Sequence, residues 1–162
     1  AKSVSEAMSE ALRGGDGAVA LSPYSCPSAQ PDMLEARVIG VLGGSAAEPR
    51  IAYLAQDAVI PAWEMPPTPG VDPVEAFRLA ARCEDHRCAQ HLAGAEGGRC
   101  GLGARIVAQL DPVVASLPSC TIRATCRWYA EQGREACLRC PQVVTLIPRN
   151  GSRMSRAAQP AG

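Results

Sequence analysis

The apolar residues of this chain fall into short runs that are separated by stretches rich in proline and glycine. Near the N-terminus, apolar side chains recur every four residues from Val4 to Leu12, which predicts a short amphipathic helix over residues 3–12. Two further apolar runs, ARVIGVL at 36–42 and IAYLA at 51–55, flank a glycine-rich turn. Runs of this length on either side of a turn predict a β-hairpin.

A different pattern begins after residue 70. Five prolines within residues 61–73 exclude regular structure in that segment. Asp72, Pro73 and Glu75 then follow the order of a helix N-terminus. The residues that follow, AFRLAARC, fit a continuation of this helix, with a strand as the alternative.

Three more elements are expected toward the C-terminus. Apolar positions at helical spacing over 102–117 predict one kinked helix, or two helices of which the second begins at Pro112. A helix over 123–132 ends at Gly133, and the run QVVTLI at 142–147 predicts a strand.

These elements together predict an α+β fold with three parts. Residues 1–70 form a small N-terminal part with the β-hairpin, and residues 71–147 form a mainly helical, loop-rich cysteine domain organised around metal. Residues 148–162 are small, polar and arginine-rich, which predicts a disordered basic tail. Because only 4% of residues are aromatic, against 14 prolines and 15 glycines, large core side chains are scarce and the eight cysteines are the expected staple.

The cysteines have to be interpreted together with the cellular compartment. The N-terminus lacks the charged and then apolar pattern of a signal peptide, and no apolar run reaches the roughly 18 residues that a membrane span needs. We therefore expect a cytoplasmic protein without a membrane partner. In a reducing cytoplasm, eight cysteines indicate metal ligands or redox thiols rather than disulfides.

Seven of the eight cysteines follow the spacing C-x4-C-x11-C-x19-C-x5-C-x10-C-x2-C-P. Zinc sites favour two tight cysteine pairs, and this chain has one, whereas iron–sulfur clusters accept one tight pair with scattered further ligands. The spacing therefore predicts an iron–sulfur cluster of the [4Fe–4S] type, with zinc as the alternative. The predicted metal ligands are Cys83, Cys88, Cys100, Cys120, Cys126, Cys137 and Cys140.

Seven thiolates are more than one cubane cluster needs. One cluster with three further thiols, a cluster with a zinc ion, and two clusters with a ligand other than cysteine all fit the sequence. His86 and His91 lie beside Cys83 and Cys88 and are either ligands or solvated side chains. Cys26 is either a remote ligand or an unligated surface thiol.

Basic and aromatic side chains near the last four cysteines are candidates for contacts with the cofactor. A [4Fe–4S] centre with four thiolates is negatively charged, so guanidinium groups beside it would stabilise it and raise its potential. An aromatic side chain would shield the cluster from water, or would simply fill a core that has few aromatics. The candidates are Arg123, Arg127, Trp128 and Arg139.

The segment ACLRCPQVV resembles the CxxCP segment of the WhiB-like iron–sulfur regulators of actinobacteria, which also carry a basic C-terminal tail. The resemblance implies a bacterial protein with a cluster bound at Cys137 and Cys140. It covers these nine residues and the character of the tail. In that family a further ligand follows CxxCP and a glycine-rich turn comes after the cluster, and this chain has neither.

The sequence contains no phosphate-binding loop. Its only two histidines lie beside cysteines, so a Ser/His/Asp triad is not expected and no catalytic residue is assigned. Residues 1–98 hold 7 basic and 13 acidic side chains, whereas residues 99–162 hold 9 and 3, which suggests a charged partner or neutralisation of one half by the other.

We therefore predict an iron–sulfur protein with a redox, sensing or accessory role toward a protein partner, rather than an enzyme on its own. The alternative is a zinc-stapled module for binding protein or nucleic acid. Nucleic acid is the lesser candidate, because solvation accounts for the tail arginines as well as phosphate contacts do: Arg149, Arg153 and Arg156.

Overall fold

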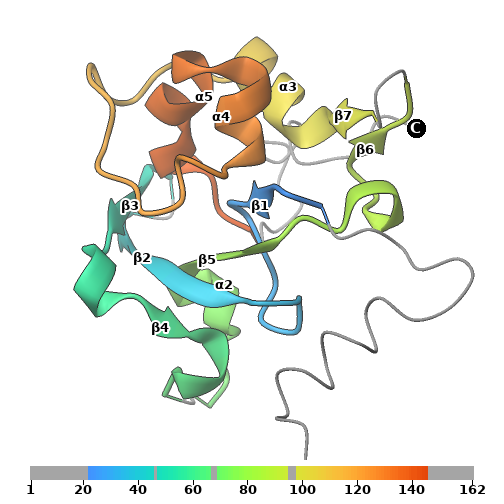
Figure 1. Ribbon diagram of the computed structural model, residues 1–162. Coiled ribbons are helices and arrows are strands. Elements are labelled where there is room, and N and C mark those ends of the chain that lie inside the picture. The colour runs from blue at the N-terminus through green and yellow to red at the C-terminus, as the bar shows by residue number, and fades with distance from the viewer. Residues whose placement is uncertain (1–21, 46, 67–68, 95–97, 146–162) are drawn as a thin grey trace, which may run out of the picture.

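A computed structural model describes residues 22–45, 47–66, 69–94 and 98–145. The larger of its two sheets contains five strands: β1 (Ser25–Cys26), β2 (Arg37–Gly44), β3 (Pro49–Tyr53), β4 (Ile60–Pro61) and β5 (Phe77–Arg82). They form one curled antiparallel sheet in the order β1-β5-β2-β3, with β4 paired to the first residues of β2 (Figure 1). A separate ribbon pairs β6 (His91–Leu92) with β7 (Arg99–Cys100).

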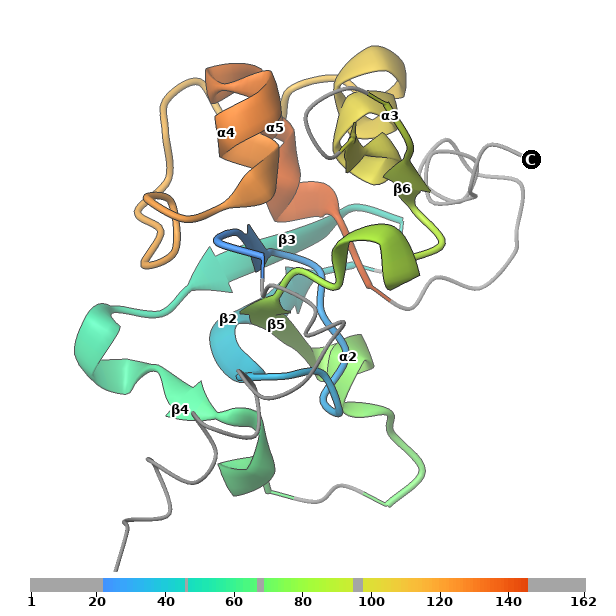
Figure 2. The same cartoon turned by 45° about the vertical axis from the view of Figure 1, so that its right-hand side comes forward.

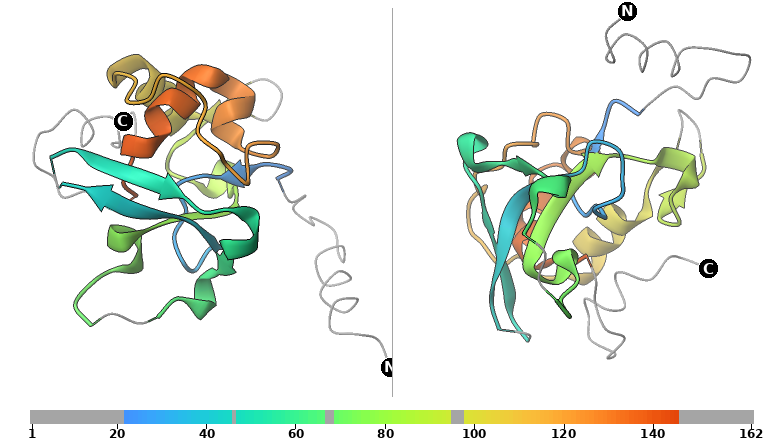
Figure 3. Two further views of the ribbon diagram at one scale, coloured as in Figure 1. Left: turned by 90° about the vertical axis from the view of Figure 1, so that its left-hand side faces the viewer. Right: turned by 90° about the horizontal axis from the view of Figure 1, so that it is seen from below.

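The described helices are short: α2 (Pro73–Ala76), α3 (Gly101–Gln109), α4 (Arg127–Gln132) and α5 (Arg134–Arg139). Single 3-10 turns lie at Gln56–Ala58, Ala62–Glu64, Asp85–Arg87 and Cys140–Gln142. Helices α3, α4 and α5 pack against one another and cover one face of the sheet, as Figures 2 and 3 show.

The core lies on both faces of β5, because the side chains of a strand alternate between its faces. Leu79 and Ala81 pack away from the helical layer, together with Val74 of α2. Ala80 packs with residues of β2 and of the three helices on the opposite face. Arg78, two positions before Ala80, is on that same face and is only 1% exposed. The strand therefore directs one charged side chain into the layer between sheet and helices.

The prediction of a mainly helical cysteine domain organised around metal was wrong. The sheet is the main element, and the longest described helix has nine residues. Within the described ranges, no group of three or more Cys, His, Asp or Glu side chains is placed to hold a metal ion. The prediction failed mainly at Phe77–Arg82, which we expected to be helical and which is a strand. This run is buried on both faces and forms the strand between β1 and β2.

Two local predictions are confirmed. The hairpin is present, with β2 and β3 paired from Gly40 opposite Tyr53 to Gly44 opposite Pro49. The helix start is present too, since the Asp72 carboxylate accepts a hydrogen bond from the Val74 amide over 3.1 Å. The helix that Asp72 caps is a single turn, because the chain continues directly into β5.

The elements after residue 100 are shorter than predicted. Helix α3 ends at Gln109, before Pro112, and α4 begins at Arg127 rather than at residue 123. Residues 142–145 form no strand. The helix expected over 3–12 and the tail at 148–162 lie outside the described residues. Within the described part, no helix has the length and apolar character needed to cross a bilayer.

Candidate functional site

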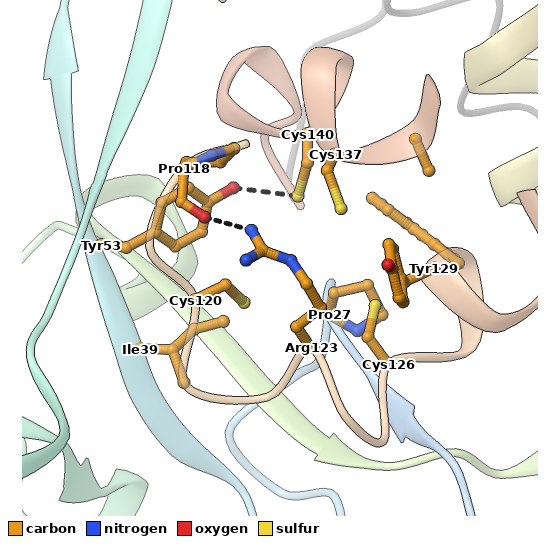
Figure 4. A pocket seen from close by; sticks show the side chains of 12 residues that line it. Pro27, Ile39, Tyr53, Pro118, Cys120, Arg123, Cys126, Tyr129, Cys137 and Cys140 are labelled. Atoms are coloured by element: carbon orange, nitrogen blue, oxygen red, sulfur yellow. Dashed lines mark hydrogen bonds between the residues drawn. The ribbon is translucent and has the colours of Figure 1, made fainter. Parts of the chain in front are cut away.

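Four cysteines meet in a pocket between the sheet and the helical layer. Cys120 comes from the loop before α4, Cys126 caps α4, Cys137 lies in α5 and Cys140 directly follows it. Their side chains line a small hollow of about 20 Å³ (Figure 4). Most of the remaining lining is apolar and includes Pro27, Ile39, Pro118, Trp128 and Ala136.

The chain reverses at Gly133 to bring these cysteines together. Gly133 has a φ of 66°, in the left-handed region that glycine adopts without strain, and it ends α4 and caps α5. Helix α5 then packs against α4. Cys137 and Cys140 are three residues apart, which places both on one side of this short helix.

Two side chains from the sheet hold Cys140. The Tyr53 hydroxyl donates to the Cys140 sulfur over 2.9 Å, and Arg78 Nη2 donates to the same sulfur over 3.0 Å. Burial and the neighbouring Cys140 sulfur raise the pKa of Tyr53, which therefore remains a donor. Arg78 also donates to three backbone carbonyl oxygens, those of Pro27, Cys140 and Val143.

Arg78 is a buried cation that forms no ion pair with any carboxylate of the described residues. Its guanidinium carbon lies 5.5 Å from the centre of the Trp128 ring. Burial lowers the pKa of Arg78, but the neighbouring Cys140 and Tyr53 side chains raise it, and the net shift is upward. Because a buried guanidinium stays charged, it needs an opposite charge beside it. The Cys140 sulfur is the hydrogen-bonded neighbour that can carry one.

Arg123 is the second cation of this pocket. Its guanidinium donates to the Pro118 carbonyl oxygen and reaches into the space between the cysteines (Figure 4). It lies over the Tyr129 ring, 6.0 Å from the ring centre, and its Nε is buried without a hydrogen-bond partner. Arg123 therefore lies close to the thiols and forms a hydrogen bond with the Cys137 side chain.

Two thiols of the pocket, Cys126 and Cys137, have raised pKa values, which favours their protonated forms. Burial raises the pKa of Cys126 to about 12, although the backbone N–H groups of Trp128 and Tyr129 lower it in part. Burial also raises the pKa of Cys137, against the opposing effect of Arg123. Metal binding requires thiolates, so loading this pocket would release protons.

The other four cysteines form a second group. Cys26 lies in β1, Cys83 directly after β5, Cys88 after the following 3-10 turn, and Cys100 in β7. Burial raises the pKa of Cys26 to about 12, and the neighbouring sulfurs of the other three add to this shift. The Cys100 sulfur accepts a hydrogen bond from the indole of Trp128, which also lines the first pocket. Trp128 therefore lies between the two groups.

The structure thus brings all seven cysteines that we predicted as ligands into two groups and adds Cys26 to the second. Arg123 and Trp128 line the first pocket. Arg127 instead faces the second group, where its Nη1 lies 3.3 Å from the Cys83 sulfur. Arg139 lies at neither group: it donates to the Leu110 carbonyl oxygen and pairs with Glu135.

Arg78 and Tyr53 are not among the candidates predicted from the sequence, although both contact Cys140. A signal for Arg78 does exist. It interrupts a run that is otherwise apolar, and a charged side chain in a strand that is buried on both faces needs a buried partner. Because we expected Phe77–Arg82 to be a helix, the unusual position of this arginine was not recognised from the sequence.

The spacing of the thiols limits what each group can hold. The four sulfurs of a zinc site lie about 3.8 Å apart, given a Zn–S bond of about 2.3 Å in tetrahedral geometry. In the described ranges no three potential ligands are gathered around a point in this way. Among the described residues, neither group therefore has the geometry of a site for a single ion.

Comparisons with protein-family models, with curated proteins and with solved structures find no match for this chain. The likeness of the CxxCP segment to the WhiB-like regulators therefore carries no family assignment, and the function has to be argued from the site.

Proposed function

We propose that Cys120, Cys126, Cys137 and Cys140 bind an iron–sulfur cluster, and that the protein exchanges electrons with a protein partner through it. The main support for this proposal is the buried guanidinium of Arg78. Its guanidinium donates to the Cys140 sulfur over 3.0 Å and has no carboxylate partner in the described part of the chain. A cluster held by four thiolates is anionic and would supply the missing negative charge.

A [4Fe–4S] cluster suits this pocket better than a zinc ion. Thiolates are soft donors that suit both iron and zinc, so the ligand type does not separate them. The spacing of the cysteines along the chain does, because it offers one tight pair where zinc sites favour two. Arg123 would have to leave the space between the cysteines and give up its hydrogen bond to the Pro118 carbonyl oxygen.

The surroundings of the pocket support a redox role. The apolar lining excludes water, and the donors from Tyr53 and Arg78 would stabilise added negative charge and so raise the reduction potential. Cys120 and Cys137 are only half-buried, so one side of the cluster would lie near the surface, within reach of a partner protein. Eight free thiols suit a reducing compartment such as the cytoplasm.

The test is the metal content of the full-length protein after anaerobic purification. We expect iron and acid-labile sulfide in equal amounts, with a broad visible absorption that bleaches on reduction. The variant Cys137→Ser should lose about four iron per chain, because it removes one of four ligands to a cubane cluster. Arg139→Ala is the matched control: Arg139 lies two residues from Cys137 and outside the pocket, so its variant should keep its iron.

Stoichiometric zinc without sulfide in the wild-type protein would contradict the proposal. So would a Cys137→Ser variant that retains the iron content of the wild type.

A further inference from the structure

Backbone pairing assembles the second group of thiols from distant parts of the chain. β1 pairs antiparallel with β5, and the Cys83 amide donates to the Tyr24 carbonyl oxygen over 3.0 Å, which brings Cys83 beside Cys26. In the ribbon, Cys100 lies opposite His91, whose amide donates to the Cys88 carbonyl oxygen over 3.1 Å. Cys26 thus comes from the sheet, Cys83 from the residue directly after it, Cys100 from the ribbon and Cys88 from the turn that precedes the ribbon.

Each sulfur of this group accepts a hydrogen bond from the backbone N–H two residues later. Such donors stabilise negative charge on sulfur, and hydrogen bonds to the ligand sulfurs are one of the factors that set the potential of a cluster. The pairs are Asp85 with Cys83 and Gln90 with Cys88, both at 3.4 Å, and Ser28 with Cys26 and Leu102 with Cys100.

A buried guanidinium lies beside this group as well. Arg127 is 3% exposed, and its Nη1 lies 3.3 Å from the Cys83 sulfur. Unlike Arg78, it is paired with two carboxylates, those of Asp85 at 2.6 Å and Glu131 at 2.9 Å. These two carboxylates hold the guanidinium in position against the sulfur.

We propose that Cys26, Cys83, Cys88 and Cys100 hold a second iron–sulfur cluster, separated from the first by the indole of Trp128. This inference goes beyond the proposed function, which needs only the first pocket. It divides the eight cysteines into two complete sets of four ligands, so neither His86 nor His91 is required as a ligand.

Iron and sulfide content per chain tests the second site. Full-length wild-type protein purified anaerobically should hold about eight iron, and Cys26→Ser, Cys88→Ser and Cys137→Ser should each hold about four. The double variant C88S/C137S should hold none. Because one indole separates the two clusters, the electron paramagnetic resonance signal of the fully reduced wild type should be broadened by magnetic interaction. Each single variant should give the narrower signal of one isolated cluster.

The outcomes separate this inference from the proposed function. About four iron in the wild type, lost in Cys137→Ser and kept in Cys26→Ser and Cys88→Ser, would overturn the second site and leave the first intact. Zinc that is lost only in Cys88→Ser would overturn the cluster assignment of the second group. If Cys26→Ser fails to fold, Cys88→Ser decides, since Cys88 lies outside the sheet.

Discussion

Replacing Arg78 by methionine is expected to lower the free energy of unfolding by about 3–5 kcal/mol and to abolish cluster binding in the first pocket. Arg78 donates to three buried carbonyl oxygens and to the Cys140 sulfur. Methionine fills a similar volume but leaves these acceptors without a donor, and each unsatisfied buried group costs about 1–3 kcal/mol. Urea unfolding of the reduced full-length protein measures the loss of stability, and iron content measures the loss of the cluster.

Arg82→Met is the matched control on the same strand. Arg82 pairs with Glu35, whose side chain is 51% exposed, so its replacement should cost less than about 1 kcal/mol. Equal losses of stability in the two methionine variants would contradict the importance assigned to the buried guanidinium.

A lysine at position 78 separates the charge of Arg78 from its hydrogen bonds. Arg78→Lys keeps the positive charge but lacks the planar fork that serves several acceptors at once. We expect it to be less stable than the wild type and to bind more iron per folded chain than Arg78→Met does. If the two variants bind iron equally, the charge of Arg78 does not support the cluster.

The sequence predicts which residues are candidate metal ligands, but it does not predict how they are grouped in space. Cysteine number and spacing indicate metal ligands because thiolates are soft donors, and this needs no knowledge of the fold. The division into two groups depends on the pairing of β1 with β5, which brings Cys26 beside Cys83. A contact between residues so far apart in sequence leaves no local pattern, so the sequence left the role of Cys26 open.

The helix assignment failed for a related reason. Asp72 and Glu75 form a genuine capping box, and the leucine, alanine and arginine residues that follow all favour helices. Burial between β1 and β2 nevertheless makes Phe77–Arg82 a strand, since tertiary packing overrides propensities worth only fractions of a kcal/mol per residue. The hairpin was predicted correctly because its pairing partners lie next to each other in sequence.

Trp128 contacts both groups of cysteines, since it lines the first pocket and forms a hydrogen bond with Cys100 of the second group. Trp128 is 2% exposed and packs so closely on α3 that a Cβ added at Gly103 would lie 2.9 Å from the indole Cδ1. Trp128→Ala should lower the free energy of unfolding by about 3–5 kcal/mol, because it opens a large cavity in the core. It should also speed the loss of iron from both sites in air, since the indole shields the first pocket and donates to the Cys100 sulfur of the second group.

Tyr129→Ala is the matched control, because Tyr129 is the adjacent aromatic residue, lines only the first pocket and is 36% exposed. It should cost much less stability and speed iron loss from the first site alone. Trp128→Phe retains most of the apolar volume but removes the N–H donor to Cys100, so it should affect the second site more than the first. Iron content followed over time in C88S and C137S backgrounds resolves the two sites. If Trp128→Ala and Tyr129→Ala affect the same single site, the indole does not lie between two clusters.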